Sequence, residues 1–197
     1  MVKKKAPDGG PILKFETRDA WAMWLETNHA SSAGVWLRIA RAKAEKLKSL
    51  SHGEALEAAI CYGWIDAQKR GESETAWLER FTPRGKKSIW SKINTKKALT
   101  LIGDGRMKAA GLREVERAKA DGRWEAAYDS PSAAAVPDDL QAALNRNAKA
   151  SAFFHTLDSA NRYAILFRLQ TAKRPETRAK RLQQFLDMLE RNEKLHP

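Results

Sequence analysis

The chain has very little cysteine: Cys61 is the only one in 197 residues. One thiol cannot form an internal disulfide or a multi-cysteine zinc site. No stretch approaches the ~20 apolar residues of a membrane-spanning helix. The first fifteen residues also run into proline and glycine where a signal peptide needs an apolar region. We therefore expect a cytoplasmic, soluble protein without a transmembrane segment.

The sequence also lacks the spacings that commonly mark chemistry. Its four histidines show no metal-ligand spacing such as HxxxH, and no serine lies in a GxSxG pattern. The residues around Gly85 do not fit a phosphate-binding Walker loop, which needs glycine, four residues, and then Gly-Lys-Ser/Thr. We therefore predict no metal, no cofactor and no catalytic residue. An enzyme of unrecognised type stays open as an alternative, with Asp66 among its first suspects.

Positive charge is what the sequence has in excess. Its 36 lysines and arginines against 24 acidic residues give a net charge of +12. The excess is concentrated between Arg80 and Lys97, where seven cations stand without one acidic residue. A basic surface attracts polyanions such as nucleic acid, anionic membranes or acidic proteins. We therefore expect an anionic or polar partner.

Hydrophobic periodicity predicts an α+β module in the first part of the chain. Residues 35–41 alternate as a half-buried strand does, and residues 51–63 begin with a capping-box pair and stop at a glycine, as a helix does. Residues 64–70 and 76–82 are aromatic and separated by a turn-like segment, which indicates an antiparallel hairpin. The expected module is a small antiparallel sheet packed by helices.

The composition of the chain changes after residue 125. Residues 126–136 are small, proline-bearing and unpatterned, which is typical of a linker. Beyond them apolar residues recur at helical spacing, with Ser159 placed to cap the third of the expected helices. We predict an α+β module over 12–125, a linker over 126–136 and a small all-helical C-terminal domain over 137–197.

The stretch FTPRGKKSIWSKIN, residues 81–94, is the candidate binding site. Its cations are expected to contact an anion near the positive end of the following helix, and its small polar residues are expected to donate hydrogen bonds. Trp90 is expected to be a wall of the site or part of the core. The hypothesised binding residues of this stretch are Arg84, Lys86, Lys87, Ser88, Trp90, Ser91 and Asn94.

Two residues of the preceding strand complete the hypothesised site. Asp66 and Gln68 are expected to share one strand face and to line a polar pocket beside an indole. A simpler interpretation is an ion pair of Asp66 with Arg80 or Arg84 across the hairpin. Both interpretations stay open at the level of the sequence.

A nucleic-acid-binding module is the main alternative function. Cations for phosphates are interleaved with Trp77, Phe81 and Trp90, whose rings could stack on bases. The competing interpretation is that these aromatics are core residues beneath a solvated basic face. The alternation of Trp77, Glu79 and Phe81 on one strand face favours burial.

Several unusual strings give the chain a family resemblance. GWIDAQ at 63–68, RFTPR at 80–84, SIWSKIN at 88–94, VPDDL at 136–140 and AKRPETR at 172–178 resemble the bacterial proteins of the YdeI/OmpD-associated, or bacteriocin-protection (OmdA-like), family. The resemblance covers nearly the whole chain after residue 12. It implies a two-part protein with an N-terminal module reminiscent of the YjbR/CyaY-like fold.

The resemblance also implies a role without assigning a mechanism. The family name implies tolerance of bacteriocins or antimicrobial peptides and an outer-membrane porin as a partner, in a role described as periplasmic. No catalytic residue or cofactor is implied. We therefore predict a non-enzymatic binding protein with a basic strand-to-helix corner and an unknown anionic or polar ligand, possible nucleic acid included.

Overall fold

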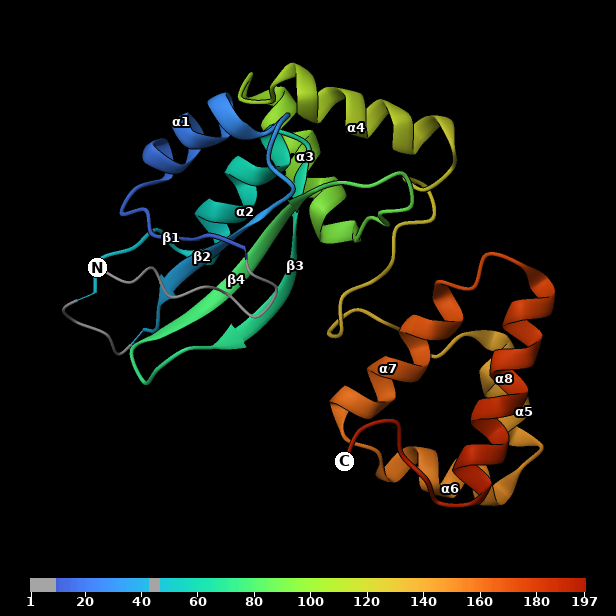
Figure 1. Cartoon of the computed structure of the whole chain (residues 1–197). Helices are drawn as coiled ribbons and strands as arrows, with labels where there is room; N and C mark the ends of the chain where they lie inside the picture. Colours follow the sequence, from blue (N-terminus) through green and yellow to red (C-terminus); the bar gives the residue numbers. More distant parts are fainter. Residues whose placement is uncertain (1–9, 43–46) are drawn as a thin grey trace. The chain divides into compact units, whose positions relative to one another are not determined.

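The structure is a computed structural model, and it describes residues 10–42 and 47–197 (Figure 1). The chain divides into two compact units. The N-terminal unit contains the chain up to residue 89 together with residues 94–125, and the C-terminal unit contains residues 90–93 and 126–197. The predicted α+β class is confirmed, since the described residues form a four-stranded sheet in the N-terminal unit and eight helices along the chain.

The sheet of the N-terminal unit is built around the predicted hairpin. The strand order is β1-β2-β4-β3, and β3 and β4 pair antiparallel, as do β2 and β4. The two-residue β1 adds a parallel edge beside β2, which makes the sheet mixed. The strands are β1 Ile12–Leu13, β2 Val35–Ala40, β3 Trp64–Gly71 and β4 Ala76–Pro83.

The helices of the N-terminal unit begin and end where local chemistry favours it. The expected capping box is present at the start of α2: Ser51 Oγ accepts from the backbone N–H of Glu54, and the backbone N–H of Ser51 donates to the Glu54 carboxylate. This cap fixes the first residue of α2, His52, above the sheet. The helices are α1 Arg18–Asn28, α2 His52–Cys61, α3 Lys92–Gly103, of which residues 94–103 belong to this unit, and α4 Ala109–Ala120.

Aromatic side chains form the core of the N-terminal unit, between the sheet and its helices. Trp21 of α1 lies 5.9 Å from Phe81 of β4 and 6.3 Å from Trp64 of β3, measured between ring centroids. All three side chains are buried. The indole N–H groups are satisfied, because Trp21 donates to the Ala55 carbonyl and Trp64 to the His29 carbonyl.

Two glycines let α4 approach the end of α2 closely. Gly63 has φ +74°, and a Cβ there would lie 2.9 Å from the carbonyl oxygen of Ala110. A Cβ on Gly111 would lie 2.4 Å from the carbonyl oxygen of Cys61. Side chains at either position would therefore force the two helices apart. The close contact sets the position of α4 and of the arginines that it carries.

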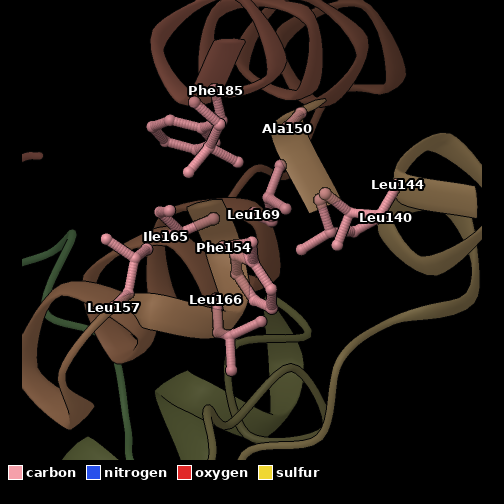
Figure 2. Close-up of a cluster of buried hydrophobic side chains, with 10 residues drawn as sticks. Leu140, Leu144, Ala150, Phe154, Leu157, Ile165, Leu166, Leu169 and Phe185 are labelled. Atoms are coloured by element: carbon pink, nitrogen blue, oxygen red, sulfur yellow. The ribbon is translucent and has the colours of Figure 1, made fainter. Parts of the chain in front are cut away.

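The C-terminal unit is a small helical domain with an apolar core (Figure 2). Its helices are α5 Asp138–Asn145, α6 Ala148–Thr156, α7 Ser159–Gln170 and α8 Pro175–Glu190. The cap of α7 is Asp158 rather than the predicted Ser159, since the Asp158 side chain accepts from the backbone N–H of Asn161. The core consists of Leu140, Leu144, Ala150, Phe154, Leu157, Ile165, Leu166, Leu169, Phe185 and Leu189.

The membrane-related predictions are tested only in part. Among the described residues no helix combines the length and the apolar character that crossing a bilayer requires. The longest helix, α8, has 16 residues, against the ~20 of a membrane span. The prediction about a signal peptide rests largely on residues 1–9, which lie outside the described part of the chain.

Candidate functional site

The loop that follows β4 is tied down from within by Arg84. This arginine is 5% exposed. Its backbone N–H donates to the Gly63 carbonyl at 2.9 Å, and its Nη1 donates to the Ile89 carbonyl at 3.2 Å. One buried side chain therefore spans the loop from its start to its end.

Arginines at the C-terminal end of α4 and just beyond it hold the same loop from outside. Arg117 Nη2 donates to the Gly85 carbonyl at 3.1 Å, and Arg123 Nη1 donates to the Ser88 carbonyl at 2.6 Å. Glu114 is paired with Arg117, and burial raises the pKa of the Glu114 carboxyl against the opposing effect of the arginines around it. We call residues 84–89 the clamped loop.

The predicted residues of the stretch 81–94 divide into exposed and buried groups. Lys86 and Lys87 are exposed at the tip of the clamped loop. Ser88 Oγ accepts from the backbone N–H of Gly85 at 2.9 Å, so it closes the turn. The side chains of Arg84, Trp90, Ser91 and Asn94 are buried. Of the predicted cations of this stretch, the two lysines are thus the ones that an external anion can reach directly. A binding role for any of these residues remains a prediction.

A β-bulge separates the two other predicted site residues. Asp66 lies opposite Phe81 and Gln68 lies opposite Arg80, while Ala67 between them has no partner on β4. Directly paired residues share a face of a sheet, so Gln68 projects to the opposite face from Asp66. The prediction that these side chains share one face was wrong, because a period of two assumes that no extra residue interrupts the ladder.

Asp66 pairs with a histidine and not with an arginine. The Nε2 atom of His52 lies 3.2 Å from Oδ2 of Asp66. The capping box fixes the start of α2 at His52, whose ring centroid lies 5.8 Å from that of Trp77 and 6.5 Å from that of Phe81, both on β4. The predicted ion pair of Asp66 with Arg80 or Arg84 was therefore wrong.

Glu79 completes a group that we call the histidine–carboxylate cluster. One ligand atom from each of His52, Asp66 and Glu79 lies within 4.8 Å of those of the other two. Glu79 is on β4, two residues before Phe81, and so shares the sheet face of Asp66. Glu79 is 5% exposed, while the side chains of His52 and Asp66 are 38% and 28% exposed. The cluster thus has a buried floor and an open rim.

The environment of the cluster shifts the protonation of two members. Burial raises the pKa of the Glu79 carboxyl to about 7, against the opposing effects of His52 and Lys69. The hydrogen bond to Asp66 raises the pKa of the His52 imidazole. Lys69 Nζ is held 3.8 Å from the ring centroid of Trp77, beside the cluster. The cluster can therefore exchange protons near neutral pH, or coordinate a cation through its nitrogen and oxygen atoms.

Sequence reasoning missed His52 and Glu79 as members of a site. The three side chains come from α2, β3 and β4, so no local spacing connects them. The sequence feature that could have identified Glu79 was its position between Trp77 and Phe81 on one face of the predicted strand. An acidic residue in a buried aromatic stripe requires either a partner or a function.

The C-terminal unit has a pocket of about 500 Å³ beside the VPDD and AKRPETR strings, with both apolar and charged side chains in its lining. Arg178 from the second string donates twice to the Asp139 carboxylate, at 2.7 and 2.8 Å. Lys92 pairs with Asp129 at 2.7 Å, and Gln170 Nε2 donates to Asp129 at 2.8 Å. Each charged side chain that lines the pocket therefore has an oppositely charged partner, which gives these family strings a structural explanation.

Comparison with known families assigns both units of the chain. Residues 13–114 match the family described as Domain of unknown function (DUF8412). Residues 133–192 match the family described as Bacteriocin-protection, YdeI or OmpD-Associated. No curated protein and no solved structure matches the chain.

Proposed function

Because the chain belongs to the DUF8412 family and carries a YdeI/OmpD-associated domain over residues 133–192, we propose that it is a non-enzymatic binding protein for an anionic partner. The proposed contact surface is the clamped loop with its two exposed lysines. The proposed compartment is the cytoplasm. The net charge of +12 supplies the long-range attraction that such a partner would feel.

The observation that carries this proposal is the fixed presentation of Lys86 and Lys87. The loop carbonyls of Gly85, Ser88 and Ile89 accept hydrogen bonds from Arg117, Arg123 and Arg84. Among the described residues no acidic side chain pairs with either lysine. A loop held in one conformation loses less conformational entropy on binding than a mobile one. The two lysines are therefore ready to contact phosphates or carboxylates.

Base stacking contributes little support to the nucleic-acid alternative. Phe81 and Trp90 are 0% and 1% exposed, so their rings belong to the core. Trp77 is partly exposed, but Lys69 already lies over its ring. Contacts with phosphates through lysine would carry such binding, which would then depend on salt and not on base sequence.

The test compares two double variants of the full chain. Lys86→Glu/Lys87→Glu reverses the charges of the clamped loop, and Lys149→Glu/Lys180→Glu makes the same change of charge at exposed positions of the C-terminal unit. Both are titrated with fluorescent single-stranded DNA and with anionic lipid vesicles, from about 50 mM salt upward. We expect the loop variant to bind far more weakly and its log–log salt slope for DNA to fall by about 1.4, at ~0.7 per phosphate contact.

The control separates a specific surface from general charge. Both variants carry the same net charge, so long-range attraction weakens equally in the two. Equal affinities for the loop variant and the control, with circular dichroism showing that both are folded, would refute the proposed surface. Binding to vesicles but not to DNA would identify a lipid headgroup as the source of the anion.

The family description also supports a role in bacteriocin tolerance, which forms part of this proposal. Direct capture of cationic peptides is disfavoured for a chain of net charge +12, because like charges repel. An anionic target that such peptides also bind is the more consistent partner. Loss of tolerance in cells that express the Lys86→Glu/Lys87→Glu variant at the normal level is the corresponding cellular test.

A further inference from the structure

Glu79 is a buried acidic residue of β4. Among the described residues no hydrogen bond or ion pair reaches its oxygens, although the residue is only 5% exposed. Buried polar groups are nearly always hydrogen-bonded, and an exception asks for a specific explanation such as a bound ion. A carboxylate that is mostly removed from water and makes no hydrogen bond within the protein is costly unless a cation or water compensates for it.

The neighbours of Glu79 are the donors that a metal ion requires. His52 contributes an imidazole nitrogen and Asp66 a carboxylate oxygen, and the donor atoms of all three residues lie within 4.8 Å of one another. We propose that His52, Asp66 and Glu79 bind a divalent first-row transition-metal ion of the Zn²⁺ class. The three donors come from the start of α2, from β3 and from β4, so the ion would join a helix to both strands of the hairpin.

The spacing of the donors suits such an ion after a small contraction. Bonds of ~2.0–2.2 Å to nitrogen and oxygen place tetrahedral ligands about 3.3–3.6 Å apart. His52 Nε2 and Asp66 Oδ2 already lie 3.2 Å apart. Glu79 lies within 4.8 Å of the other two donors, so it must close a gap of at most about 1.2–1.5 Å. Because the other two side chains are partly exposed, they can adjust their rotamers towards the buried carboxylate.

The chemistry of the cluster also selects the class of metal. An imidazole with two carboxylates suits Zn²⁺ and its neighbours, whereas Mg²⁺ and Ca²⁺ prefer all-oxygen sites. A divalent ion would neutralise the two carboxylates. It would also leave a coordination position at the exposed rim, next to Lys69, for water or another ligand. Lys69 is the cation that stands beside the cluster in the metal-free protein, held over Trp77.

The first experiment measures binding of the metal alone to the full chain. After treatment with a chelator and removal of the chelator, the protein is titrated calorimetrically with Zn²⁺ and separately with Mg²⁺. We expect one Zn²⁺ per chain and no comparable binding of Mg²⁺. At 100-fold excess over the dissociation constant, Zn²⁺ should raise the melting temperature by about 5–10 °C. Absence of Zn²⁺ binding at about 1 mM would overturn the proposal.

Substitutions then locate the ion. Glu79→Gln should weaken Zn²⁺ binding at least tenfold and abolish the thermal shift, and Glu74→Gln at an exposed position should change neither. His52→Ala should have the same effect as Glu79→Gln, with His155→Ala on exposed α6 as its control. The metal-free Glu79→Gln protein should melt no lower than the parent, because the change removes a buried charge and preserves the side-chain shape.

The two readouts keep folding and binding apart. A Glu79→Gln protein that melts normally and still shows the full Zn²⁺ shift would overturn the site. If Glu79→Gln should misfold, Asp66→Asn takes its place, because Asp66 is partly exposed and its replacement leaves the buried floor intact. Binding of Co²⁺, followed by its visible absorption, should be lost in the same variants and retained in the controls.

Discussion

The two units of the protein treat charge in opposite ways. Among the described residues, the charged side chains classed as buried are Glu79, Arg84 and Arg123, and all three lie in the N-terminal unit. The buried polar side chains of the C-terminal unit, Ser91 and Asn161, are uncharged. The pocket of the C-terminal unit instead shows charge at a partly exposed surface, already in opposite pairs.

This difference shows where the folded protein bears the free-energy cost of burying charge. Removing a charge from water costs several kcal/mol unless partners compensate for it, whereas burying a leucine or phenylalanine is favourable. The C-terminal unit avoids this desolvation cost, because its core is apolar and the charges at its pocket are paired. The N-terminal unit does not, and both proposed sites lie where its buried charges lie.

The largest expected effect tests the apolar core of the C-terminal unit. Phe154→Ala should lower the free energy of unfolding by about 3–5 kcal/mol, because it removes a buried ring and leaves a cavity. Phe154 is 2% exposed within the core of Figure 2. Urea unfolding followed by circular dichroism measures the change. His155→Ala, the exposed neighbour, should stay within ~0.5 kcal/mol of the parent. Similar losses in both variants would show that this unit has no well-packed core.

The next prediction tests the buried charges of the N-terminal unit. Arg123→Ala should cost about 2–4 kcal/mol, because the Ser88 carbonyl and the clamped loop lose their buried donor. Six of the seven tryptophans lie in the N-terminal unit, so indole fluorescence during urea unfolding reports mainly on it. Arg113→Ala on the exposed face of α4 is the matched control. An Arg123→Ala protein as stable as the control would mean that the clamp contributes nothing.

A third prediction concerns the pH dependence of stability that the buried Glu79 gives to the N-terminal unit. In metal-free protein the folded state of Glu79 holds its proton up to about pH 7, against an ordinary value of 4.5. Stability should therefore fall as pH rises from about 4.5 to 7, and the raised pKa of His52 acts in the same direction. Glu79→Gln should flatten this slope and stabilise the protein by about 1–3 kcal/mol near pH 8. A variant that keeps the full slope would contradict the assignment to Glu79.

The smallest effect is expected for the paired charges of the C-terminal unit. Arg178→Lys keeps the charge but loses the twofold donation to Asp139, and should cost about 1 kcal/mol. Hydrogen bonds from Arg178 lower the pKa of Asp139, so the contribution is present above about pH 4 and is lost as pH falls. Unfolding measured near pH 7 and near pH 3 should show a smaller difference between variant and parent at the lower pH. A cost above about 3 kcal/mol would place this pair with the buried charges instead.

Local patterns of the sequence were sufficient for most of the framework. The capping box at Ser51, the hairpin and the helical C-terminal part depend on contacts within a few residues, and the structure confirms them. The resemblance to the YdeI/OmpD-associated family is likewise confirmed over residues 133–192. The cap of α7 was misplaced by one residue, since aspartate and serine compete equally well for that position.

The candidate sites were harder to predict because they depend on contacts between distant segments. Nothing local shows that Arg84 points inwards to the Ile89 carbonyl, since a surface arginine after a proline has the same sequence. The meeting of His52 with Glu79 requires the register of α2 above the sheet. A single bulge was enough to invert the expected face of Gln68. Periodicity therefore located the elements but not the side chains that meet between them.

The same bulge has a consequence for insertions and deletions. Loss of one residue from a strand normally exchanges its two faces beyond the gap, which is why such changes are rarely tolerated. Ala67 has no partner on β4, so its loss would leave Asp66 opposite Phe81 and Lys69 opposite Glu79. A relative one residue shorter at this point would therefore present the same side chains to His52. An alignment gap at Ala67 or at Gln68 would therefore be neutral for the cluster, whereas a gap at Lys69 would remove the lysine beside it.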